Sequence, residues 1–207
     1  MAGSLAAVDP ATVLGAIATL TFLARLVPQP VRLVRTGVPD GVSPLMALNV
    51  AVTELAWLTY GFLSGLVPVW LVTLPALPLA VWTAVLLRHQ TRRRDLIGAG
   101  VWLAAIVVAW LAGALGAVLA VSVLVQYGPQ VWTALRSDRL EGIAPATWKL
   151  AIVDAFMWGA YGLAVGDAAL ILYTVTLSSC AVVILVRIAH SHRAASALRA
   201  APGRGGA

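Results

Sequence analysis

Seven long apolar runs, separated by short polar segments, restrict the folds open to this chain. The runs cover residues 11–34, 44–64, 67–87, 96–112, 115–135, 145–165 and 168–188. Each lies near the roughly 17–25 apolar residues that an α-helix needs to cross a bilayer. Only 11% of the 207 residues are charged, against about 25% in soluble domains. The sequence therefore predicts an all-α membrane protein with seven transmembrane helices.

The basic residues gather on alternate connections between these runs, which predicts how the chain is oriented. The connections at 36–41, 88–95 and 136–142 are charged, whereas those at 64–68, 113–117 and 165–167 carry almost no charge. Cytoplasmic loops of membrane proteins are enriched in Lys and Arg. We therefore expect a multi-pass protein of the cell (plasma) membrane, with its N-terminus outside and its C-terminus cytoplasmic. The same orientation accounts for the net charge of +6, so no nucleic-acid partner is expected.

An internal repeat with an offset of 101 residues is the most informative pattern in the sequence. The two copies align without a gap over residues 28–66, and the matched pairs include Pro28 with Pro129, Gln29 with Gln130, Pro44 with Pro145, Trp57 with Trp158, and Tyr60-Gly61 with Tyr161-Gly162. Each copy holds three predicted helices, and the run at 96–112 lies between the copies. That extra helix restores a parallel orientation, which gives a 3+1+3 arrangement.

The repeat also predicts the organisation of the chain. We expect a first three-helix repeat at 11–88, a basic loop and linker helix at 89–114, and a second three-helix repeat at 115–189. The remaining segment, 190–207, is rich in Ala, Gly, Arg and Ser, and we expect a disordered basic cytoplasmic tail there.

Four prolines fall at matched positions near the predicted cytoplasmic ends of the helices: Pro28, Pro44, Pro129 and Pro145. A proline inside a helix removes one backbone hydrogen bond, and prolines at helix starts are ordinary. Four of them at one depth around a two-fold axis suit a gate or hinge. Gln29 and Gln130 are then expected to satisfy the backbone groups that the prolines free.

The paired Pro-Gln steps, the Trp-x-x-Tyr-Gly motif in each half and the 3+1+3 arrangement resemble the PQ-loop superfamily. Within it, the SWEET (MtN3/saliva) sugar transporters are the most similar family, over about residues 11–188. The resemblance implies that the four matched prolines form a cytoplasmic gate. It also implies that Trp57 and Trp158 line a central sugar pocket, which Thr53 and Asp154 would face. The family's asparagine in the third helix of each repeat is missing here, because its positions fall near Pro75 and Thr176. Thr176 stays a candidate binding residue.

Two carboxylates near the middle of predicted spans are costly to insert into a membrane and therefore call for an explanation. Glu54 lies three residues before Trp57, and Asp154 lies four residues before Trp158, so each shares a helix face with its tryptophan. The carboxylates could accept hydrogen bonds from sugar hydroxyls, carry protons, or supply a structural partner for Arg25. An unpaired Arg25 could instead bind a substrate carboxylate. Asn49 and Thr53 extend the same face of the second span.

These observations predict a SWEET-like facilitator of sugar movement, of a mono- or disaccharide, that works by alternating access. The first alternative is a proton-coupled PQ-loop transporter of an amino acid or other small polar solute, and the second is a non-transporting PQ-loop receptor or scaffold. The sequence has no nucleophile motif, phosphate loop or clustered metal ligands, so we expect no enzyme activity, catalytic residue, metal or cofactor. The expected partners are a small-molecule substrate and the lipid bilayer, and a homo-oligomer stays open.

Overall fold

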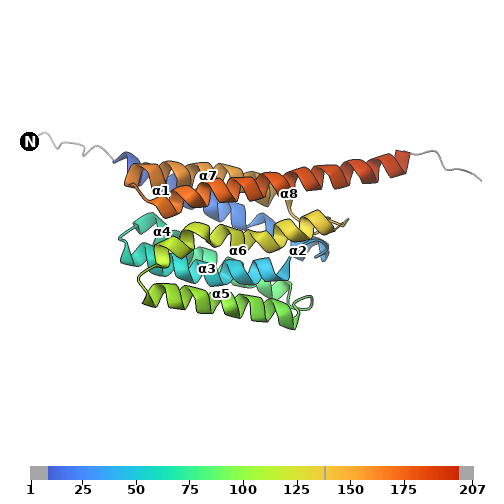
Figure 1. Cartoon of the computed structure of the whole chain (residues 1–207). Helices are drawn as coiled ribbons and strands as arrows, with labels where there is room; N and C mark the ends of the chain where they lie inside the picture. The colour runs from blue at the N-terminus through green and yellow to red at the C-terminus, as the bar shows by residue number, and fades with distance from the viewer. Residues whose placement is uncertain (1–8, 138, 201–207) are drawn as a thin grey trace, which may run out of the picture.

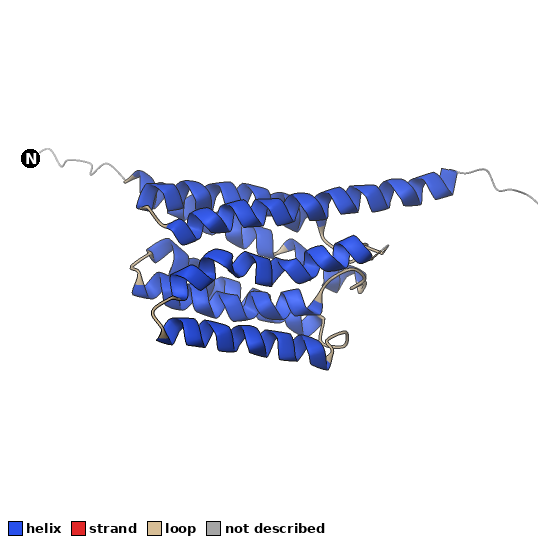
Figure 2. Cartoon of the chain, viewed as in Figure 1, coloured by secondary structure: helices blue, strands red, loops and turns tan. Residues whose placement is uncertain are grey.

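The computed structural model describes residues 9–137 and 139–200, and every regular element in those ranges is an α-helix. The helices run roughly side by side and are joined by short loops (Figure 1, Figure 2). Their bounds are α1 Pro10–Leu26, α2 Pro28–Thr36, α3 Pro44–Leu63, α4 Val67–Leu86, α5 Arg93–Leu111, α6 Leu115–Arg136, α7 Pro145–Val165 and α8 Ala168–Ala200. The prediction of an all-α protein is confirmed for this part of the chain.

Six helical segments among the described residues are long and apolar enough to cross a membrane. They are Pro10–Thr36, which joins α1 to α2, then α3, α4, α5 and α6, and the part Ala168–Ser191 of α8. By length and composition the chain is a multi-pass membrane protein. The 21-residue helix α7 is not among the six, and it carries both Lys149 and Asp154 within its length.

The helices pack in a pattern that repeats between the two halves of the chain. In the first half α4 contacts both α1 and α3, and in the second half α8 contacts both α6 and α7. Across the halves α1 contacts α7, and α3 contacts α6. Helix α5 contacts only α3 and α6 among these elements, and it lies at the edge of the bundle (Figure 1). Apart from those of α5, each of these contacts thus has a counterpart in the other half.

Prolines explain where several helices begin. Pro10, Pro28, Pro44, Pro68 and Pro145 occupy the first or second position of their helices, where the missing N–H costs no hydrogen bond.

The matched prolines 28 and 129 nevertheless act differently. The helical path breaks at Val27 before Pro28, whereas Pro129 lies inside the continuous helix α6. A second proline, Pro30, removes a further backbone donor next to Pro28, and α6 has no such neighbour.

The C-terminal part of the structure differs from the expectation of disorder from residue 190. Helix α8 continues to Ala200 and extends beyond the rest of the bundle (Figure 1). The sequence from 189 to 200 contains several alanines, and alanine has the highest intrinsic helix propensity. Residues 201–207 of the predicted tail lie outside the described part of the chain.

Candidate functional site

Trp57 of α3 and Trp158 of α7 line one buried cavity between the two halves of the bundle. This tryptophan cavity has a volume of about 20 Å³ and is lined by Phe22, Glu54, Trp57, Val69, Val72, Thr73, Trp158, Leu170 and Tyr173. Its volume is sufficient for one water-sized group. The structure therefore brings together both predicted tryptophans and one of the two predicted carboxylates.

Aromatic rings form much of the wall of the tryptophan cavity. Trp57 packs edge-to-face against Tyr173, with ring centroids 5.9 Å apart. Trp158 packs in the same way against Phe22, at 6.3 Å. Edge-to-face contacts hold such rings in defined orientations, so the walls of the cavity are fixed by packing among α1, α3, α7 and α8.

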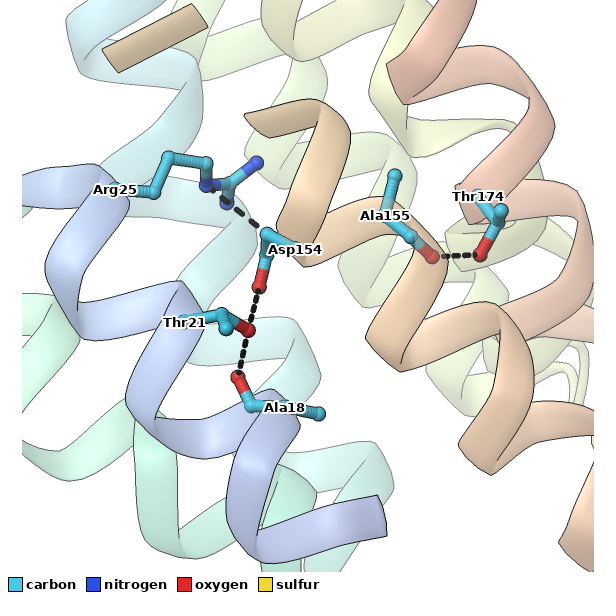
Figure 3. Close-up of polar contacts among 6 residues, drawn as sticks. All are labelled: Ala18, Thr21, Arg25, Asp154, Ala155 and Thr174. Carbon is cyan, nitrogen blue, oxygen red and sulfur yellow. Dashed lines mark hydrogen bonds and ion pairs between the residues drawn. The ribbon is translucent and has the colours of Figure 1, made fainter. Parts of the chain in front are cut away.

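Asp154 forms an ion pair with Arg25 between α7 and α1 (Figure 3). Asp154 Oδ2 lies 3.3 Å from Arg25 Nε, and both side chains are almost completely buried. Asp154 Oδ1 lies 3.2 Å from the Thr21 hydroxyl, whose single proton is shared with the carbonyl of Ala18 at 3.0 Å. The Arg25 guanidinium also stacks over the Phe22 ring at 4.5 Å. Of the two predicted carboxylates, Asp154 is the one that pairs with Arg25.

Several buried polar atoms near this ion pair have no hydrogen-bond partner within the described part of the chain. They are Arg25 Nη1, Asn49 Oδ1, Glu54 Oε2 and Tyr173 OH, beside the Arg25 Nε and Asp154 Oδ2 atoms that meet only in the ion pair. Buried polar groups are normally hydrogen-bonded, because leaving them unpaired costs free energy. Such a cluster can bind a polar ligand or water.

A second cavity lies between the ion pair and the matched prolines. This glutamine cavity has a volume of about 60 Å³, and its lining includes Arg25, Gln29, Thr83, Tyr127, Gln130 and Thr147. Arg25 lines this cavity, while Phe22, on which its guanidinium stacks, lines the tryptophan cavity. The guanidinium therefore lies at the boundary between the two.

The two glutamines of the Pro-Gln steps each bind the loop that precedes the second helix of the opposite half. Gln29 donates from Nε2 to the Gly142 carbonyl at 3.0 Å, and Gln29 Oε1 accepts from the Ala144 amide at 3.0 Å. Gln130 donates to the Gly41 carbonyl at 2.7 Å and accepts from the Ser43 amide at 2.8 Å. The four partners are themselves matched at an offset of 101 residues. The glutamines thus clamp the loops reciprocally.

These contacts differ from the expectation that the glutamines satisfy backbone groups freed by the prolines. The carbonyl that lacks a partner because of Pro129 is that of Val125, four residues earlier. Asn49 Nδ2 of α3 donates to it at 2.8 Å. Asn49, predicted to bind substrate, therefore uses its donor to complete α6. Glutamine side chains reach the loops instead, because Gln29 and Gln130 face the opposite half.

The two clamped loops cross closely at this end of the bundle. The Gly142 amide donates to the Asp40 carbonyl at 2.8 Å. A Cβ atom at Gly142 would lie 2.5 Å from that oxygen, and one at Gly41 would lie 2.6 Å from the Arg139 carbonyl. Only glycine fits such a close approach of backbones, so the loops close the proline end of the molecule.

Tyrosines occupy the opposite end in a matched way. The Tyr60 hydroxyl donates to Asp167 Oδ2 at 2.7 Å. The Tyr60 ring packs on Gly116, and the Tyr161 ring packs on Gly15, where added Cβ atoms would lie 3.0 and 3.2 Å from the rings. Gly15 and Gly116 are again 101 positions apart. Both cavities therefore lie between two packed ends.

Besides Asn49 and Asp154, which line neither cavity, two more predicted binding residues lie away from both. The Thr53 hydroxyl donates to the Asn49 carbonyl and accepts from Trp102 Nε1 of α5 at 2.8 Å. The Thr176 hydroxyl lies 2.8 Å from the Leu172 carbonyl of its own helix. Neither side chain lines the tryptophan or the glutamine cavity.

The sequence reasoning missed Thr21, Phe22, Tyr127 and Tyr173. A signal existed for Thr21, because its match at the repeat offset is Ser122 and both are hydroxyl residues of apolar spans. The aromatic residues have no aromatic match, since Phe22, Tyr127 and Tyr173 correspond to Val123, Leu26 and Val72. A search for matched positions therefore could not find them.

Fold and site together define a multi-pass helical membrane protein with a buried polar site between its two halves. No family model matches this chain, and no curated protein matches it either.

Proposed function

We propose that this protein is a SWEET-like facilitator that moves a small polar solute, a sugar first among the candidates, across the plasma membrane by alternating access. The observation that carries the proposal is a cavity lined by Trp57, Trp158 and the unpartnered Glu54. It lies between two ends that are each held by matched contacts. A transporter needs a central site and two ends that open in turn.

The proposed architecture is two parallel three-helix halves joined by α5, with seven crossings. The counterpart contacts of α1, α4 and α3 with α6, α8 and α7 support it. In this proposal α7 is the crossing between α6 and α8. Its polar residue Asp154 is paired inside the bundle, where a charge is tolerated better than in contact with lipid. The N-terminus is outside and the C-terminus is cytoplasmic.

A proton-coupled transporter of an amino acid or other small polar solute is the second candidate. The observation that favours it is Glu54, which is 2% exposed and whose Oε2 atom has no partner among the described residues. An acidic residue inside a membrane bundle is typical of proton relays. In this alternative, uptake depends on an imposed proton gradient.

The test is uptake of labelled glucose by proteoliposomes that contain the full chain, with and without a proton gradient. We expect saturable uptake that ignores the gradient. Trp57→Ala/Trp158→Ala should reduce it at least about tenfold, which corresponds to a loss of about 1.4 kcal/mol in binding. The matched control is Trp82→Ala/Trp110→Ala, which removes two exposed tryptophans and should leave uptake unchanged.

Each outcome separates the candidates. Uptake that requires the gradient favours the proton-coupled alternative. If the native protein unfolds cooperatively, and so is folded, but takes up no glucose, the sugar facilitator is contradicted. Amino acids would then be tested under the same gradient. If the alanine variant does not fold, Trp57→Phe/Trp158→Phe keeps aromatic packing and should still weaken uptake.

A further inference from the structure

The buried layer at the centre of the bundle holds one negative charge in excess when its carboxylates are ionised. It contains one cation, Arg25, and two carboxylates, Asp154 and Glu54. Arg25 pairs with Asp154 at 3.3 Å, so its charge is already matched. No described residue forms an ion pair with Glu54.

The surroundings of Glu54 do not stabilise a bare carboxylate. Oε2 has no hydrogen-bond donor among the described residues, and the side chain is 2% exposed. An isolated buried charge is strongly unfavourable unless a partner arrives. An ionised Glu54 therefore needs a partner, and a positive charge in the cavity would supply one.

The walls around Glu54 suit a cation. The rings of Trp57, Trp158, Tyr173 and Phe22 line the same cavity as the Glu54 carboxylate. Aromatic faces attract cations through their quadrupoles, and tryptophan does so most strongly. One of these rings already makes a cation–π contact, because the Arg25 guanidinium stacks on Phe22 at 4.5 Å.

The volume of the tryptophan cavity is large enough for a small charged group. A volume of about 20 Å³ holds one water-sized group, and an ammonium group has that size, whereas a sugar ring does not. The ring of a larger solute needs the halves to separate, as alternating access requires. The unpartnered Tyr173 OH then offers a hydrogen bond to one of its hydroxyl groups.

We propose that Glu54 and the tryptophan cavity bind the ammonium group of the transported solute, so that a small hydroxylated amine, such as an amino sugar, is preferred over a neutral sugar. This inference rests on the proposed function and narrows its substrate class. Glu54 supplies the opposite charge, Trp57 and Trp158 supply ring faces, and the charge of the nearby Arg25 is neutralised by Asp154.

The test compares three sugars that differ at one position: glucosamine, N-acetylglucosamine and glucose. Binding of labelled glucosamine to the purified full chain in detergent is measured, with the other two as competitors. We expect glucosamine to bind at least about tenfold more tightly than either neutral sugar. Equal affinities would overturn the proposal, and they are the result expected if a proton neutralises Glu54. Failure of the folded native chain to bind any of the three would also overturn it.

Glu54→Gln keeps the shape of the side chain and removes its charge. This variant should lose the preference for glucosamine over glucose. The matched control is Glu141→Gln, because Glu141 is the other glutamate of the chain and its side chain is exposed; it should keep the preference. A preference that survives Glu54→Gln would overturn the proposal. If Glu54→Gln does not fold, Glu54→Asp keeps the charge and should keep the preference with lower affinity.

Uptake into proteoliposomes separates this inference from the proposed function. Glucosamine binding that depends on Glu54 but leads to no uptake would contradict the proposed transport function and support the ammonium site. Uptake of glucose and glucosamine at equal rates, unchanged in Glu54→Gln, would contradict the ammonium site and support the proposed transport function.

Discussion

Asn49 shows how a single polar side chain in an apolar span can complete a neighbouring helix. Pro129 lacks the N–H that would bond the Val125 carbonyl, and this carbonyl lies within a helix of spanning length, where lipid offers no hydrogen-bond donor. The Asn49 amide supplies the missing donor across the contact between α3 and α6. A proline in one half of the chain is therefore tolerated because of an asparagine in the other half.

This compensation predicts non-additive effects on stability. Asn49→Leu should lower the free energy of unfolding by about 1–3 kcal/mol, because it leaves the Val125 carbonyl unbonded. In a Pro129→Ala background the amide of residue 129 can bond that carbonyl, so the same substitution should cost less. The measurement is a double-mutant cycle by unfolding in detergent. Equal costs in both backgrounds would contradict the assigned role.

At the scale of elements, the reciprocal glutamine clamps connect each half to the loop of the other. Gln29 and Gln130 each form two hydrogen bonds to loop backbone, at buried or partly buried positions. Opening of the proline end has to break these four bonds, because the loops cannot separate while they persist. The clamps therefore contribute to the stability of the closed state at that end, together with the bond from the Gly142 amide to the Asp40 carbonyl.

Loosening one clamp should expose the loop that it holds. The reporter is the thiol of Ala144→Cys in a Cys180→Ala background, since Cys180 is the chain's one cysteine. Gln29→Leu removes two hydrogen bonds worth roughly 2 kcal/mol together, so maleimide labelling should become at least about tenfold faster. The control is Gln126→Leu, because Gln126 is equally buried but bonds Ser122 within its own helix. Equal labelling rates in the two variants would show that Gln29 does not hold the loop.

At the scale of the whole molecule, α7 decides how many times the chain crosses the membrane. It falls outside the set of helices that qualify by length and hydropathy, yet it contacts α1 and α8 over much of its length. A helix enclosed by others need not be apolar all around, because its polar residues find partners in the bundle. In the proposed topology α7 is therefore the seventh crossing.

Seven crossings place the two ends of the chain on opposite sides of the membrane, whereas six would place them on the same side. A C-terminal green fluorescent protein fusion should be fluorescent in bacterial cells, and a C-terminal alkaline phosphatase fusion should be inactive. An N-terminal epitope tag should be accessible from outside in intact cells. An active phosphatase fusion, or a tag that is reached only after permeabilisation, would contradict the proposed topology.

The sequence by itself determined the properties that depend on local composition and on position within the repeat. Apolar runs of spanning length predict helices, because a helix satisfies its own backbone in lipid. The offset of 101 residues also led to Trp57 and Trp158, which line one cavity. Matched residues occupy similar places in the two halves, and those on the faces where the halves meet can line one cavity.

Only the tertiary structure decided which polar groups become partners. The repeat offset aligns Asp154 with Thr53 and not with Glu54. Neighbouring positions on a helix point about 100° apart, so Thr53 faces Trp102 of α5 while Glu54 faces the cavity. Asp154 meets Arg25 because α7 packs on α1. Pairing of this kind depends on how helices far apart in sequence rotate against one another, and a residue pattern along one chain does not contain that rotation.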